Sequence, residues 1–129
     1  VLTFSLTELK PVGIFRDDIP AGQLFDYILA SASLPIFRTV KIDGRRYIDG
    51  GVYNNRPTEM LLEKGFRLII EVEVGGIGPV REYDAGPATI ISIKPAKPIG
   101  GILDIRHEMI DANIARGYQD AHAVLRRYF

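Results

Sequence analysis

The chain has 129 residues, of which 47% are hydrophobic and 25% are charged, and its 16 basic and 16 acidic side chains cancel. This composition is typical of one globular domain or of a large part of one. The charge balance argues against nucleic acid as a partner, and the absence of cysteine excludes both a disulfide framework and a cysteine nucleophile. Two histidines, His107 and His122, are too few and too far apart for a typical metal centre, and we expect both to be solvated.

The N-terminal part predicts a strand followed by a helix. Residues 1–6 alternate apolar and hydroxyl side chains, which favours a strand. A strand that begins at the first residue is expected of a partial chain or of a processed terminus. Residues 10–13 predict a break, after which residues 14–16 pair back. A helix is expected from Ala21, ending before Pro35. Its predicted buried stripe consists of Leu24, Phe25, Ile28, Leu29 and Ala32.

A β-hairpin is predicted over residues 40–48, because Asp43-Gly44 supplies the positive φ angles of a type I′ turn. Its second strand leads directly into Asp49. Pro57 suits the first turn of a short helix, for which Asn54 or Asn55 is the expected cap. Gly65 is a suitable residue to end that helix.

The C-terminal part predicts two buried strands and a long helix. Residues 66–74 and 89–93 are nearly continuous apolar runs, which are typical of strands buried on both faces in parallel sheets. The intervening residues 75–86 are expected to be a plain loop, because Pro79 breaks the glycine pattern of a dinucleotide-binding turn. A helix is predicted over residues 102–125, in which Gly117 indicates close packing or a tolerated interruption.

The alternation of strands and helices predicts an α/β fold. We expect a three-layer sandwich with a mostly parallel sheet covered by helices, plus the β-hairpin before Asp49. Asp49-Gly50-Gly51 lies where an apolar strand runs into a glycine turn. A carboxylate at this position is held by a rigid strand and is open to a ligand. As an isolated tripeptide, however, this sequence is usually only a turn.

Several ordered blocks place the tripeptide in a wider context. An Ala-Ser-x-x-x-Pro-x-Phe block covers residues 30–37, an aspartate with two glycines covers residues 49–51, and Asn-x-Pro covers residues 55–57. Together with Gly117-Tyr118 in the predicted last helix, these blocks resemble the C-terminal half of a patatin-like phospholipase domain. The resemblance covers nearly the whole chain.

The resemblance implies a lipid acyl hydrolase, a phospholipase or esterase, that uses a Ser-Asp dyad. Asp49 would be the general base, and Gly50 and Gly51 would complete its motif. The implied substrate is a lipid or another acyl ester, with contact at a membrane surface. The implied mechanism needs no metal and no cofactor.

The nucleophile of such a dyad lies in a Gly-x-Ser-x-Gly motif. None of the four serines, Ser5, Ser31, Ser33 and Ser92, lies in such a motif. We therefore interpret residues 1–129 as the C-terminal part of one patatin-like domain, without the upstream part that bears the nucleophile. The isolated chain should be inactive and should associate with another chain or with the missing part. The alternative is a non-catalytic α/β module for ligand binding or interaction.

Overall fold

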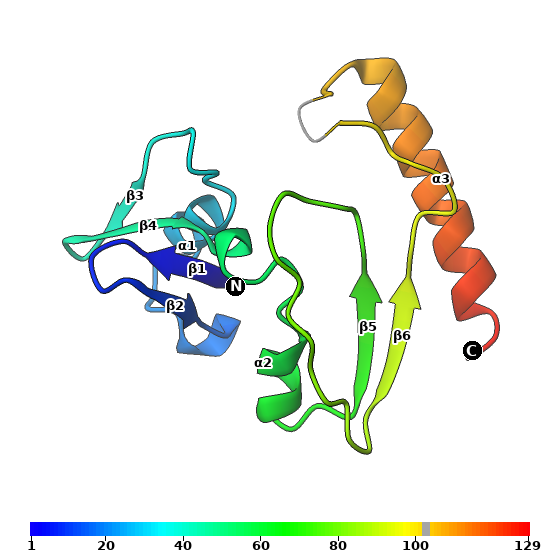
Figure 1. Cartoon of the computed structure of the whole chain (residues 1–129), viewed down its shortest axis with the longest axis horizontal. Helices are drawn as coiled ribbons and strands as arrows, with labels where there is room; N and C mark the ends of the chain where they lie inside the picture. The colour runs from blue at the N-terminus through cyan, green and yellow to red at the C-terminus, as the bar shows by residue number, and fades with distance from the viewer. Residues whose placement is uncertain (102–103) are drawn as a thin grey trace. The chain divides into compact units, whose positions relative to one another are not determined.

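The computed structural model describes residues 1–101 and 104–129. The chain divides into two compact units. Unit 1 comprises Val1–Pro57 and Ile77–Glu82, and unit 2 comprises Thr58–Gly76 and Tyr83–Phe129. Each unit contains both strands and helices, so the predicted mixed α/β class is confirmed (Figure 1).

Unit 1 is built on an antiparallel sheet of four strands in the order β2-β1-β4-β3. The strands are β1 (Leu2–Ser5), β2 (Lys10–Gly13), β3 (Val40–Ile42) and β4 (Arg45–Asp49). Every pairing in this sheet is antiparallel. The mostly parallel three-layer sandwich is therefore not what the described strands form. The hairpins β1–β2 and β3–β4 are joined by tight turns, which can connect only antiparallel neighbours.

The second strand lies earlier than the sequence pattern predicts. Lys10–Gly13, predicted as a break, forms β2, whereas residues 16–18 form the short 3-10 helix η1 (Arg16–Asp18). The reversal occurs before β2, where Leu9 has a φ of 53° and the amide of Glu8 donates to Ser5 Oγ at 3.1 Å. A proline is tolerated within β2 because this strand lies at the edge of the sheet.

The hairpin before Asp49 is confirmed. Asp43 and Gly44 have φ angles of 47° and 80°, the two positive values that a type I′ turn requires. Its strands position Ile42 and Tyr47 in the core of unit 1.

Helix α1 (Leu24–Ser31) covers this core with a face other than the predicted one. Tyr27 and Ala30 are buried, and the Tyr27 ring lies 6.2 Å from the Tyr47 ring. The predicted stripe is largely exposed, with Phe25 at 71% and Ile28 at 50%. The helix carries apolar residues on two faces, and the face with the small Ala30 allows the closer approach to the sheet.

Unit 2 contains α2 (Thr58–Glu63), β5 (Leu68–Val72), β6 (Thr89–Ile93) and α3 (His107–Leu125). β5 and β6 form a parallel pair (Figure 1). Gly65 ends α2 with a φ of 95°, as predicted, and the amide of Phe66 donates back to the carbonyl of Leu61 at 3.1 Å.

β5 is not buried on both faces. Its residues alternate, so that Ile69 and Glu71 are buried whereas Leu68, Ile70 and Val72 are exposed. The buried carboxylate of Glu71 accepts hydrogen bonds from the hydroxyls of Thr58, Tyr83 and Ser92. A polar group is stable inside this unit because hydrogen bonds replace its lost hydration.

Helix α3 begins at His107. The predicted start at Ile102 lies outside the described residues. Side chains of the helix bond the preceding segment, with Asn113 donating to the carbonyl of Ile99 at 2.8 Å and Arg116 to that of Pro98 at 3.0 Å. A Cβ at Gly117 would meet no atom within 4 Å, so this glycine marks no close packing. Among the described residues, no helix is long and apolar enough to cross a membrane.

Candidate active site

Asp49 is the last residue of β4 and is half-buried. Its backbone is held from two sides. The Asp49 amide donates to the carbonyl of Ser33 at 2.8 Å, and β4 pairs with β1 such that Asp49 lies opposite Thr3. The carboxylate therefore projects from a fixed point in the sheet.

The carboxylate itself caps the following 3-10 helix η2 (Gly50–Val52). Oδ1 of Asp49 accepts a hydrogen bond from the amide of Gly51 at 2.8 Å. Within residues 1–101 and 104–129, Oδ2 makes no hydrogen bond. One oxygen thus fixes the orientation of the carboxylate, and the other makes no hydrogen bond to the described residues.

Close contacts surround both glycines of the motif, and those of Gly50 to backbone atoms exclude a larger residue. A Cβ on Gly50 would lie 2.5 Å from the carbonyl oxygen of Leu2, because η2 packs directly on β1. A Cβ on Gly51 would lie 3.0 Å from Oδ1 of Asn55 and 3.2 Å from Oδ1 of Asp49. The turn therefore packs tightly against β1 at Gly50 and against polar side chains at Gly51.

Asn54 stabilises the same turn through hydrogen bonds. This residue is 2% exposed, and its backbone amide donates to the carbonyl of Gly50 at 3.0 Å. Its side-chain Oδ1 accepts from the backbone amide of Arg56 at 3.0 Å. The side chain thus bonds the backbone of the turn at a residue that precedes α2, and the capping of α2 by Asn54 or Asn55 stays a prediction.

The serines of unit 1 have structural roles. Ser33 Oγ donates to the carbonyl of Leu29 at 2.7 Å, as expected of a residue at a helix end, and Ser31 Oγ donates to the carbonyl of Leu2 at 2.8 Å. The structure does not bring either into hydrogen-bond contact with the Asp49 carboxylate.

Arg45 and the two histidines lie at the surface. Arg45 at the hairpin pairs with Glu8 at 3.2 Å, and His107 and His122 are exposed on α3, as predicted. Within the described part of the chain, no group of three or more histidine, cysteine or acidic residues could hold a metal ion.

A cavity of about 410 Å³ lies between the end of α1 and β3. Its walls include the apolar side chains of Leu29, Phe37 and Val40, the guanidinium group of Arg38, and Ser33. Because the carbonyl of Ser33 accepts the amide of Asp49, one wall of the cavity is bonded to the backbone of the candidate base.

The sequence pattern did not predict that residues 77–82 contact the turn after Asp49. Residues Ile77–Glu82 belong to unit 1, and Pro79 accepts the Asn55 amide at 2.8 Å. The sequence predicted only a loop here, and no periodicity in the loop indicates a partner some 25 residues earlier in the chain.

Residues 2–62 match the family model described as Patatin-like phospholipase. The resemblance to the patatin-like family is confirmed over these residues, and for the rest of the chain, Gly117-Tyr118 included, it stays a prediction. The matched segment is just under half of the chain, and it contains all four strands of unit 1 and the Asp49 turn. No curated protein gives a significant match to the chain. The patatin-like match indicates the lipid acyl hydrolase family.

Proposed function

We propose that this chain supplies the aspartate base of a patatin-like acyl hydrolase with a Ser-Asp dyad. The observation that carries the proposal is the state of the Asp49 carboxylate at the end of β4. Oδ1 is held by the Gly51 amide at 2.8 Å, and Oδ2 makes no hydrogen bond within the described residues. A serine hydroxyl is a weak nucleophile and needs a base that is positioned in this way.

The reaction would proceed in two balanced steps. In the first, the serine oxygen attacks the ester carbonyl while its proton passes to Asp49 and then to the departing alcohol. In the second, a water molecule gives its proton to Asp49 and attacks the acyl-serine, and the proton returns to the serine oxygen as the acid leaves. Asp49 ends each cycle as a carboxylate.

The family match and the cavity beside Ser33 support the proposed substrate class. A cavity with Leu29, Phe37 and Val40 in its walls is suited to an apolar acyl chain, and Arg38 adds a positive charge for an anionic group. A lipid or another acyl ester, encountered at a membrane surface, is the proposed substrate.

The nucleophile must come from residues outside the 129 printed here, because no serine among them lies in Gly-x-Ser-x-Gly. The chain would then be the C-terminal part of one patatin-like domain. In that domain β5 and β6 would join a larger, mostly parallel sheet, and helices packed on that sheet would cover the apolar side chains now exposed on β5.

The test compares two isosteric substitutions in the protein at its full encoded length. Asp49→Asn should reduce hydrolysis of a 4-nitrophenyl ester by at least about 100-fold, since general-base catalysis contributes roughly that factor. Asp43→Asn in the exposed hairpin turn is the matched control and should leave turnover unchanged, because asparagine also tolerates a positive φ. Near wild-type turnover in Asp49→Asn would refute the assignment.

A second measurement concerns the nucleophile. A fluorophosphonate probe, which reacts with activated serines, should not label the 129-residue chain. Labelling of any of its four serines would contradict the proposed division of the dyad.

A further inference from the structure

The segment Ile77–Glu82 is bonded to the turn that follows Asp49. The carbonyl of Pro79 accepts the amide of Asn55 at 2.8 Å, and the amide of Arg81 donates to Oδ1 of Asn54 at 3.3 Å. Gly78 lies so close to this turn that a Cβ there would overlap the carbonyl oxygen of Gly51. Three successive parts of the segment thus meet three residues of one short turn.

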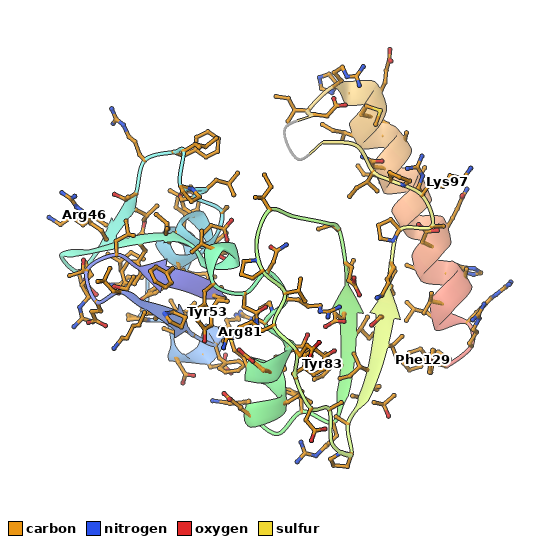
Figure 2. All side chains as sticks on the ribbon, viewed as in Figure 1. Arg46, Tyr53, Arg81, Tyr83, Lys97 and Phe129 are labelled. Carbon is orange, nitrogen blue, oxygen red and sulfur yellow. The ribbon has the colours of Figure 1, made fainter. Side chains whose placement is uncertain are left out.

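A fourth contact comes from side chains. The guanidinium carbon of Arg81 lies 4.5 Å from the centre of the Tyr53 ring, in cation-π geometry (Figure 2). Tyr53 follows η2 directly. The segment therefore contacts the turn through its backbone and through the stacking of Arg81 on the Tyr53 ring of the turn.

Asn54 connects the segment Ile77–Glu82 to the turn that follows Asp49. Its Oδ1 accepts from the amide of Arg56 at 3.0 Å and from the amide of Arg81 at 3.3 Å, and its own amide donates to the carbonyl of Gly50 at 3.0 Å. Asn54 thus bonds the segment through its buried side chain and Gly50, the first residue after Asp49, through its backbone amide.

The turn needs such support because of its composition. Two consecutive glycines have more backbone freedom than any other pair of residues, and the Asp49 carboxylate is oriented through the amide of the second one. A base must lie close to its target proton, and a displacement of about 1 Å can cost about 100-fold in rate.

We propose that Ile77–Glu82 is a positioning strap that holds the Gly50–Asn55 turn, and with it the Asp49 carboxylate, in the reactive orientation. Gly78 and Asn54 are its positioning residues. This role rests on the proposed function of Asp49 as the base. The strap acts on the rate of the chemical step and makes no contact with substrate.

The first test is Gly78→Ala in the protein at its full encoded length. The added methyl must displace the strap from Gly51, so kcat for a 4-nitrophenyl ester should fall at least about 10-fold while KM stays within about two-fold. Val80→Ala is the matched control on the same strap, because its side chain is exposed, and it should leave both constants unchanged. Equal kcat values for Gly78→Ala and the wild type would overturn the proposal.

Hydrogen exchange separates positioning from general unfolding. In Gly78→Ala the amides of Gly51 and Asn55 should exchange faster, whereas amides of the β3–β4 hairpin should keep their wild-type rates. Unchanged exchange at Gly51 and Asn55 would overturn the proposal even if Asp49 proved not to be the base. Loss of activity in Asp49→Asn combined with full activity in Gly78→Ala would refute the strap alone.

A second pair of variants keeps the test valid if Gly78→Ala fails to fold. Asn54→Ala removes the acceptor for Arg56 and Arg81, and kcat should fall at least about 10-fold. Asn54→Asp retains an acceptor at the same position and should recover most of the lost rate. Full activity in Asn54→Ala, or no recovery in Asn54→Asp, would contradict the role assigned to this side chain.

Discussion

Replacement of Gly50 by alanine should destabilise the sheet that carries Asp49. The new Cβ would lie 2.5 Å from the carbonyl oxygen of Leu2 and 2.6 Å from both its carbonyl carbon and its Cγ. Two of these atoms belong to the backbone of β1, so they cannot rotate away. The clash can be relieved only if η2 and β1 separate.

The size of the effect follows from two opposing contributions. Overpacking of a buried site costs up to about 3 kcal/mol, and the upper value applies here because backbone atoms are involved. Loss of glycine from the unfolded chain returns about 0.4–1 kcal/mol to the folded state. The net loss is about 2 kcal/mol, which corresponds to about a 30-fold change in the opening equilibrium.

Native-state hydrogen exchange of the 129-residue chain measures this quantity locally. Amides in β1 and β4 should exchange about 30-fold faster in Gly50→Ala than in the wild type. Gly117→Ala is the matched control, because a Cβ there meets no atom within 4 Å, and α3 amides should instead gain about 1 kcal/mol of protection. Wild-type or slower exchange of the β1 and β4 amides in Gly50→Ala would refute the steric reasoning.

Three further predictions concern other parts of the chain. Burial raises the pKa of Tyr27 above its ordinary value of 10.0, so the stability that the neutral Tyr27 contributes is fully present below pH 10 and is lost as the pH rises through the folded pKa. In urea titrations above pH 10, Tyr27→Phe should therefore lose less free energy of unfolding than the wild type. Parallel losses in the two proteins would contradict this. Glu71→Leu removes the acceptor of three hydroxyl groups and should lower the free energy of unfolding of unit 2 by about 3 kcal/mol, measured by urea unfolding. A variant more stable than the wild type would show that the buried carboxylate lowers the stability of the unit. The exposed apolar face of β5 should cause concentration-dependent association, seen in sedimentation velocity as a rising mass and reduced by Ile70→Thr; a constant monomer mass would count against it.

Local chemistry made the hairpin and the Asp49 turn predictable. Asp43-Gly44 can adopt two positive φ angles in succession at little cost, which specifies both the turn and the register of the flanking strands. That register determines that β4 ends at Asp49. Gly65 was predictable for the same reason, since a helix end with a positive φ has few acceptable residues.

Pairing between distant segments was not predictable to the same degree. β1 alternates correctly for a strand, but nothing in its residues indicates that it pairs antiparallel with β4, whose first residue is Arg45. The expected parallel sheet was a generalisation from alternating strands and helices, and among the strands of the described residues it holds for β5 and β6 alone. Likewise, the period of α1 predicted one buried stripe, whereas the contact of Tyr27 with Tyr47 shows that another face meets the sheet.

The same distinction explains why Asp49 was found and its strap was not. A carboxylate at a strand end followed by two glycines is a local pattern, and one sequence window contains all of it. The strap acts through the carbonyl of Pro79 and the missing side chain of Gly78, and neither a carbonyl nor an absent Cβ has a sequence signature of its own. A backbone contact between distant loops is compatible with many residue types, so it becomes visible only when the folded chain brings the two segments together. The candidate carboxylate is thus specified locally, whereas the turn that holds it is bonded to residues that sequence patterns do not connect to it.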